Sequence, residues 1–381
     1  MPGITDRSTN PHHQRRVRKR SLVTPGRMQA LTLAVAAAMA LPPNPTPSDG
    51  DHMDDDRSEL VPETVLEAFG FVGANSKMFE RGVINRHWLV ARGDESIVIR
   101  RYHPSRTAAA IGWEQRLVQQ AASRSWPVAA ASPAADGSIL FAHEGRFWAA
   151  APFLPGESRS PGSETPAQYH IIGRLLGRLH RDLAGFASEG QRPDFGKLWE
   201  LDAWVAPAGF GSFNQILRDF ETEYPDLAQL VRRQRYRSLR ELSRLKYPDL
   251  PELPIHGDFQ RWNLLWQDGQ LTGLLDFDQA RLDAFVADIA PLLMPHMPLE
   301  LPFARALLEG YQSVRPLSDT EWDLLPALVR ASLLWWVAYV LADWRRTKVE
   351  PGAIFRTMTV RFPAFDAREA EFRSLRGRAR V

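Results

Sequence analysis

The chain has 381 residues, of which 44% are apolar and 24% charged, which indicates a globular protein of roughly two domains and excludes a disordered one. It contains no cysteine, which excludes disulfides, thiolate zinc sites and cysteine nucleophiles. The net charge of +2 arises in residues 1–52, where seven Arg or Lys stand against three acids, so the remainder is slightly acidic and its charge does not favour nucleic-acid binding.

Residues 1–52 differ from the rest of the chain. A basic run at Arg15–Arg20 precedes an apolar stretch at Leu31–Leu41 and a proline-rich segment, which is the outline of a secretory signal. The apolar stretch is too short to span a bilayer. The competing interpretation, which we favour, is a disordered leader or an extension upstream of a start at Met53.

A small antiparallel sheet with one helix across it is predicted for residues 58–154. A short helix capped by Ser58 is expected, because Val65, Leu66 and Phe69 follow at helical spacing. Alternating and apolar runs bounded by turn residues predict strands. The predicted strands are Gly82–Val90, Ser96–Tyr102, Ser138–Ala142 and Arg146–Leu154, and the helix is Ala108–Ala122.

Pro155 interrupts this pattern, and residues 155–381 read as a mostly helical lobe after a hinge near Leu154. The helices are expected near residues 171–179, 213–224, 227–245, 301–314 and 322–344. The apolar centre of the last helix, Leu333–Ala342, is too short for a membrane span and is expected in the core. The fold class is therefore α+β with two lobes.

The most informative stretch runs from His256 to Asp278 and reads HGDFQRWNLLWQDGQLTGLLDFD. Asp258 and Asn263 are separated by four residues. Two apolar runs then flank an Asp-Gly pair, which predicts a tight hairpin that returns Asp276 toward the loop of Asp258. Carboxylate and amide oxygens converging in this way can hold Mg²⁺. Taken singly, Asp-Gly could be a plain turn and His-Gly-Asp a helix cap.

The order D-x-x-x-x-N, strand, D-F-[GD] is that of a protein-kinase catalytic loop and its metal-binding Asp. The variant here, HGD-x-x-x-x-N with LLDFD, resembles the aminoglycoside phosphotransferase and choline kinase family of small-molecule kinases. The resemblance covers about residues 59–345 and implies a protein-kinase-like fold that uses ATP and Mg²⁺. Secretion would suit such an enzyme poorly, so a cytoplasmic location is expected.

The resemblance also implies roles for the residues of this stretch. Asp258 would be catalytic, accepting or orienting the proton of the acceptor hydroxyl, while Asn263 and Asp276 would hold Mg²⁺. Asp278 is left open between a further metal ligand and a structural role. His256 would brace the loop rather than carry a proton. Asp288 is expected to brace it too, and His180 to lie in the core or cap a helix.

In the small lobe, Ile97–Arg100 matches the V-A-I-K strand of kinases with Arg in place of Lys. A cation there would bind the nucleotide's phosphates, and Glu114 on the following helix is its expected partner. A surface Arg and a solvated Glu are the alternative. Arg101 is a second candidate, although strand alternation would turn it to the opposite face.

The adenine is expected beneath Ala151–Leu154. Pro152 lacks an N–H, so Phe153 or Leu154 would be the donor to the base. Ile84, Ile99 and Leu275 could sandwich the ring or belong to the core.

No G-x-G-x-x-G precedes the phosphate strand. The segment Glu80–Arg86 resembles instead the G-[IVL]-x-N-x-x-[WY]-x-V form of homoserine kinase-like phosphotransferases, in which Gly82 and Asn85 would approach the phosphates. A plain β-hairpin is the equal alternative.

The expected function is that of an ATP-dependent kinase acting on a small-molecule hydroxyl acceptor: a homoserine-like amino acid, an amino alcohol, a sugar or an aminoglycoside. No nucleic-acid or membrane partner is expected. The alternative is a catalytically idle nucleotide-binding protein on a kinase fold. A protein kinase ranks last, because there is no A-P-E segment and only about ten residues separate Asp278 from Asp288, leaving little room for a peptide.

Overall fold

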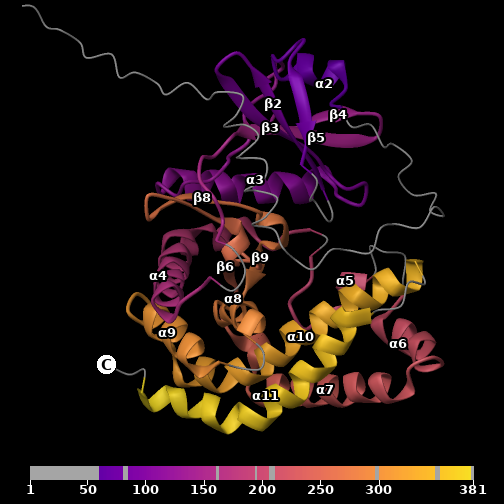
Figure 1. Ribbon diagram of the computed structural model, residues 1–381, viewed down its shortest axis with the longest axis vertical. Helices are drawn as coiled ribbons and strands as arrows, with labels where there is room; N and C mark the ends of the chain where they lie inside the picture. The colour runs from indigo at the N-terminus through magenta and orange to yellow at the C-terminus, as the bar shows by residue number, and fades with distance from the viewer. Residues whose placement is uncertain are drawn as a thin grey trace, which may run out of the picture.

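The computed structural model describes residues 60–79, 85–159, 163–193, 195–205, 211–296, 300–347 and 352–378. An antiparallel sheet of order β1-β2-β3-β5-β4 forms the N-terminal lobe, and helices dominate the rest of the chain. Figure 1 shows α3 and the hairpin that contains β8 lying between this sheet and the helical lobe. The α+β class and the division into a sheet lobe and a helical lobe are confirmed, whereas the boundary after Leu154 stays a prediction.

The N-terminal lobe comprises α2 Glu63–Ala68, β1 Asn75–Met78, β2 Arg86–Arg92, β3 Glu95–Arg101, α3 Ala108–Ser123, β4 Phe141–His143 and β5 Arg146–Pro152. The helical lobe comprises α4 Pro166–Leu183, α5 Leu201–Val205, α6 Phe213–Glu221, α7 Pro225–Arg244, β6 Leu253–Ile255, β7 Leu264–Gln267, β8 Gln270–Leu274, β9 Arg281–Asp283, α8 Val286–Ile289, α9 Leu301–Gln312, α10 Asp319–Thr347 and α11 Gly352–Arg378.

Several predicted boundaries in the small lobe are wrong. Helix α2 has Pro62 at its N-cap with no side-chain cap hydrogen bond, and Ser58, predicted as the cap, lies outside the described residues. Strand β1 was not predicted at all. Strand β4 begins at Phe141 rather than Ser138, because Ser138 is held in a turn by the carboxylate of Asp136 and the carbonyl of Leu140. The predicted strand start at Gly82 and the 1–52 extension also lie outside the described residues.

The central strand β3 separates two environments. It pairs antiparallel with β2 on one side and β5 on the other. Ile99 joins Trp88, Trp148 and Val65 of α2 in a buried apolar cluster on one face of the sheet. Because side chains alternate along a strand, the neighbouring Arg100 emerges on the opposite face, toward α3.

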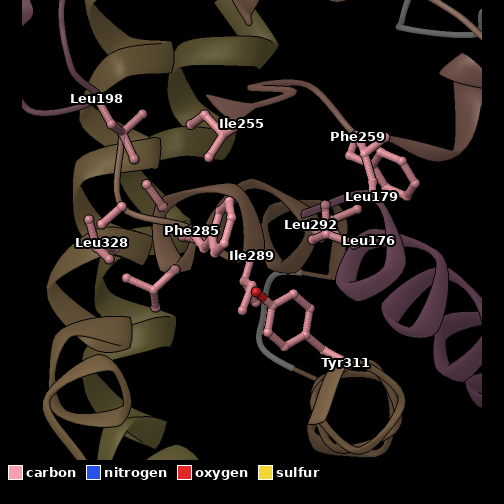
Figure 2. Packing of buried hydrophobic residues seen from close by; sticks show 14 of the residues in the cluster. Leu176, Leu179, Leu198, Ile255, Phe259, Phe285, Ile289, Leu292, Tyr311 and Leu328 are labelled. Carbon is pink, nitrogen blue, oxygen red and sulfur yellow. The ribbon is translucent and has the colours of Figure 1, made fainter. Parts of the chain in front are cut away.

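The core of the helical lobe gathers apolar side chains from α4, α8, α9 and α10. Figure 2 shows Leu176 and Leu179 of α4 facing Leu292, while Tyr311 of α9 points toward Ile289. Helices α4 and α9 approach unusually closely: a Cβ at Gly173 would lie 2.1 Å from the carbonyl oxygen of Leu307. The absence of a side chain at Gly173 therefore permits this contact.

The hairpin predicted from Asp-Gly is present. Strands β7 and β8 pair antiparallel, and Asp268 and Gly269 have φ angles of 51° and 76°, as a two-residue type I′ turn requires. The turn fixes the register and brings the end of β8 back beside the start of β7: the N–H of Leu275 donates to the carbonyl of Asn263 at 2.9 Å.

Helix α10 contains an apolar stretch, Asp319–Ala342, that is long enough by length and composition to cross a membrane. Its mean hydropathy is 1.7 in the most apolar window, of which 78% is buried inside the protein. The prediction concerned only the apolar centre at Leu333–Ala342, and apolar residues upstream of Leu333 make the stretch longer than that centre. Its burial agrees with the prediction that it belongs to the core.

Candidate active site

The loop after β6 is fixed by a buried carboxylate. Asp288 accepts hydrogen bonds from the backbone N–H groups of His256 and Gly257, both at 2.8 Å. It also contacts Nε2 of His180, at 3.1 Å, and all these groups are buried. Gly257 has a φ of 81°, and a Cβ there would lie 2.3 Å from the carbonyl oxygen of Gln279, so only glycine fits. This geometry supports the bracing role expected for Asp288 and places His180 in the core.

His256 ties the same loop to the hairpin. Its Nε2 lies 3.0 Å from the carbonyl oxygen of Leu275, and its Nδ1 accepts the backbone N–H of Asp258 at 3.3 Å. These two bonds require a neutral ring with the proton on Nε2. Burial lowers the pKa of His256 to about 4, which keeps the ring neutral near pH 7. The arrangement supports a brace rather than a proton carrier.

Asp258 and Asn263 lie in direct contact. The amide Nδ2 of Asn263 donates to Oδ2 of Asp258 at 2.9 Å and to its carbonyl oxygen at 2.8 Å. The indole of Trp262 lies 3.4 Å from the same Oδ2. Burial raises the pKa of Asp258 to about 6, against the opposing effect of these two donors. The carboxylate is therefore able to exchange a proton near neutral pH.

Asp276 follows β8 in a left-handed conformation, with φ 62° and ψ 69°. One of its carboxylate oxygens accepts the N–H of Asp278 at 3.4 Å. The pKa of Asp276 is raised, first by the surrounding protein, which removes part of its hydration, and then by repulsion from Asp278. Part of the residue remains exposed to solvent. The turn thus places Asp276 near enough to Asp258 for their charges to repel each other.

These residues fit a hard cation. Within the described residues, neither Asp258 nor Asp276 forms an ion pair, and Oδ1 of Asn263 accepts no hydrogen bond. The described part of the chain has no group of three His, Cys, Asp or Glu that could hold a metal by itself. A carboxylate and an amide that complete their coordination with nucleotide phosphates and water are what Mg²⁺ usually finds in kinases.

The cation predicted on β3 meets the carboxylate predicted on α3. A terminal nitrogen of Arg100 lies 3.0 Å from Oε1 of Glu114, and the pair is almost wholly buried. The other terminal nitrogen contacts Asp278, whose second oxygen receives the amide of Asn85. Arg100 lowers the pKa of Asp278 against the effect of burial. Of the two roles left open for Asp278, this contact favours the structural one.

Arg101 points away from this cluster, as strand alternation predicted. Its guanidinium lies over the rings of Trp88 and Trp148, at 5.7 and 5.6 Å from their centroids, on the opposite face of the sheet. It is therefore not the residue that meets Glu114.

Arg192 is a buried member of the site that was not predicted. It donates to the second oxygen of Glu114 at 3.0 Å and to the carbonyl oxygens of Asp278 and Ala280 at 3.0 and 3.1 Å. It thereby joins α3 to the loop that carries Asp276. The surrounding Gln191-Arg192-Pro193 carries no periodicity or motif, so the sequence offers no signal for this role.

The residues expected around the adenine are only partly brought together. β5 ends at Pro152, and the N–H groups of Phe153 and Leu154 make no hydrogen bond to the described part of the chain, so both remain candidate donors. Ile99 belongs to the apolar cluster on the face of the sheet opposite Arg100, so it cannot face the base. The prediction that it could sandwich the adenine is therefore wrong, and it belongs to the core. Gly82 and Ile84 lie outside the described residues.

The sequence matches the model of the phosphotransferase enzyme family over residues 77–325. A homoserine kinase from Gluconobacter oxydans is 29% identical over 308 residues, which are 77% of this chain and 91% of that protein. The chain is also similar in structure to a microcompartment-associated aminopropanol kinase, with a TM-score of 0.64 and 19% identity over 82% of this chain and 98% of the other.

A second solved structure is that of the amicoumacin kinase hAmiN in complex with AMP-PNP, Ca²⁺ and Ami. Its TM-score is 0.60 and its identity 16%, over 82% of this chain and 90% of the other. At these identities the two solved structures show the fold alone, and that fold is the one predicted from the order of motifs.

Proposed function

This chain belongs to the phosphotransferase enzyme family as an ATP-dependent kinase with a small-molecule hydroxyl acceptor, and we propose that the acceptor is a hydroxy amino acid of the homoserine class. The name of the Gluconobacter oxydans relative, which matches across most of both chains, supports this choice of acceptor. The G-x-x-N segment ending at Asn85 supports it too, since it resembles the form found in homoserine kinase-like enzymes.

The observation that carries the proposal is the contact between Asp258 and Asn263 beside Asp276. Among the described residues these two carboxylates have no cationic partner, and the amide oxygen of Asn263 accepts no hydrogen bond. A pKa near 6 suits Asp258 to receive or orient the proton of an acceptor hydroxyl. Because phosphoryl transfer needs little covalent help, positioning and charge neutralisation account for most of the catalysis.

The other residues of the site would hold the nucleotide. Arg100, oriented by Glu114, would bind phosphate oxygens through its planar guanidinium. The N–H groups of Phe153 or Leu154 would bind the adenine edge. Asn263 and Asp276 would hold Mg²⁺, which when bound neutralises charge that develops on the transferring phosphoryl group.

The segment that follows Asp278 favours a small acceptor. β9 and α8 follow Asp278 directly, and both are buried. Asp283, at the end of β9, is itself buried and accepts hydrogen bonds from Tyr247 and Arg281, so it serves the fold rather than the acceptor. A peptide-docking segment has no place here, in agreement with a small molecule as substrate. We also propose a cytoplasmic location, where ATP is available.

The test is an ADP-release assay of the full chain with ATP and Mg²⁺ against L-homoserine, amino alcohols, sugars and aminoglycosides. The proposal is supported if the wild-type protein releases ADP in the presence of homoserine, and if the Asp258→Ala variant releases none but still binds AMP-PNP. Binding of AMP-PNP without turnover on any acceptor would support the catalytically idle alternative.

A further inference from the structure

Arg106 lies beside the site, and its guanidinium has no polar partner among the described residues. It lies in the short connection between β3 and α3, directly before the N-cap residue Thr107. It is half-buried, its Nε is shielded from solvent without a hydrogen-bond partner, and it forms no ion pair within the described residues. The guanidinium makes an aromatic contact, 4.7 Å from the ring centroid of Phe195.

The position of Phe195 places Arg106 next to the phosphate-binding cluster. Arg192 packs against the same ring, at 4.3 Å, and reaches Glu114 with its NH2 at 3.0 Å. Glu114 in turn holds Arg100. The positive charge of Arg106 accordingly contributes to lowering the pKa of both Glu114 and Asp278. Three arginines therefore surround two carboxylates, and Arg106 is the one that contacts neither.

The contrast among the three arginines points to a ligand. Arg100 contacts the carboxylates of Glu114 and Asp278, and Arg192 contacts that of Glu114 together with the carbonyl oxygens of Asp278 and Ala280. A half-buried guanidinium without such partners has lost part of its hydration, and a bound oxyanion would restore that free energy. Helix α3 adds to the attraction, because its first turn contains no acidic residue to offset the positive end of its dipole.

We propose that Arg106 binds the terminal phosphate of the nucleotide and so distinguishes ATP from ADP. The inference rests on the proposed function and extends it. The terminal phosphate is favoured over an anionic group of the acceptor because the neighbours of Arg106, namely Arg100 and Glu114, are the residues that would position nucleotide phosphates. The guanidinium can offer two parallel N–H groups to two oxygens of one phosphate, which gives both affinity and orientation.

The experiment compares the affinities of AMP-PNP and ADP, with Mg²⁺, by calorimetry on the full chain. Arg106→Gln should weaken AMP-PNP by about 10- to 100-fold, the loss of a charge-assisted contact, and leave ADP nearly unchanged. Arg106→Lys keeps the charge but not the paired N–H groups of the guanidinium, so its affinity for AMP-PNP should fall between those of wild type and Arg106→Gln. Arg116→Gln is the matched control, since this exposed arginine of α3 pairs with Glu189 and should change neither affinity.

Different results would contradict the proposed function and the role of Arg106. Wild type that binds neither nucleotide would contradict the proposed function itself. Wild type that binds both, together with an Arg106→Gln variant that keeps the ratio of the two affinities, would overturn the role of Arg106 alone. So would unchanged AMP-PNP affinity with a raised KM for homoserine, which would move Arg106 to the acceptor. Arg106→Lys supplies the comparison if Arg106→Gln folds poorly.

Discussion

Asn263 donates its side-chain amide to the carboxylate of Asp258 at 2.9 Å, across the four residues that separate them in the chain. Because the amide nitrogen is used in this contact, the amide oxygen of Asn263 stays available for a metal ion. A local motif thus positions both the proposed proton acceptor and one proposed metal ligand, while β8 leads to the second proposed ligand, Asp276, at the other end of the hairpin.

Asp276 and Asp278 should respond differently to neutralisation. Asp276→Asn should raise the Mg²⁺ concentration needed for half-maximal AMP-PNP binding by at least about tenfold, since even outer-shell changes commonly cost that much. Asp278→Asn removes a charge paired with Arg100, so it should lower the free energy of unfolding and leave the Mg²⁺ dependence unchanged. Titrations of Mg²⁺ and of urea measure the two effects. The reverse pattern would make Asp278 the metal ligand.

Glu114 should matter to folding as well as to nucleotide binding. Glu114→Ala removes the buried carboxylate shared by Arg100 and Arg192 and so breaks two buried ion pairs at once. We expect a loss of about 3–5 kcal/mol in the free energy of unfolding, measured in urea. Glu189→Ala, which breaks the exposed pair with Arg116, should cost no more than about 1 kcal/mol. Similar losses in the two variants would contradict the buried network.

His256 should make stability depend on pH. Its pKa is about 4 in the folded protein and about 6.5 in the unfolded chain, so the unfolded state binds the proton first as pH falls. The stability due to the neutral ring is fully present above pH 6.5. It declines by about 1.4 kcal/mol per pH unit toward pH 4.

His256→Gln can keep both hydrogen bonds but cannot titrate. The difference in unfolding free energy between wild type and this variant should therefore shrink as pH falls from 7.5 to 4.5. A difference that stays constant over this range would show that His256 does not titrate as a buried neutral ring.

Gly173 should tolerate no side chain. Gly173→Ala places a Cβ 2.1 Å from the carbonyl oxygen of Leu307, so α4 and α9 must separate, and we expect a loss of about 1–3 kcal/mol or more. Gly185→Ala is the control, because no atom lies within 4 Å of its added Cβ. Thermal unfolding of the two variants measures the difference. Equal midpoints would mean that the helices do not pack as closely as described.

The hairpin of β7 and β8 could be predicted because its signals are local. The Asp268-Gly269 pair dictates the turn, and the turn dictates where Asp276 falls relative to Asp258. The pairing of Arg100 with Glu114 could be predicted from chain order once the motif was in place. Strand alternation alone placed Arg101 on the other face of the sheet.

Other features depend on contacts between distant segments and leave no local signal. β1, with the sequence Asn-Ser-Lys-Met, lacks the apolar alternation of a strand and is defined by its pairing with β2. Arg192 reaches Glu114 across 78 positions from a loop without periodicity. The motif around Asn85 drew attention to that residue, but it gave no sign of its contact with Asp278, 193 positions away. The sequence does not decide whether Ile99 lies beside the adenine or in the core, because strand alternation does not say which face of the sheet meets the nucleotide.

The most direct test follows the phosphoryl group itself. The full chain is incubated with ATP labelled at the γ-phosphate, Mg²⁺ and L-homoserine, and the products are separated and identified by mass spectrometry. The label should appear on the hydroxyl of homoserine, and Asp258→Ala should reduce its transfer by about 10²- to 10⁴-fold while still binding AMP-PNP. Label that stays on ATP, in a wild-type protein that binds AMP-PNP, would contradict phosphoryl transfer to this acceptor.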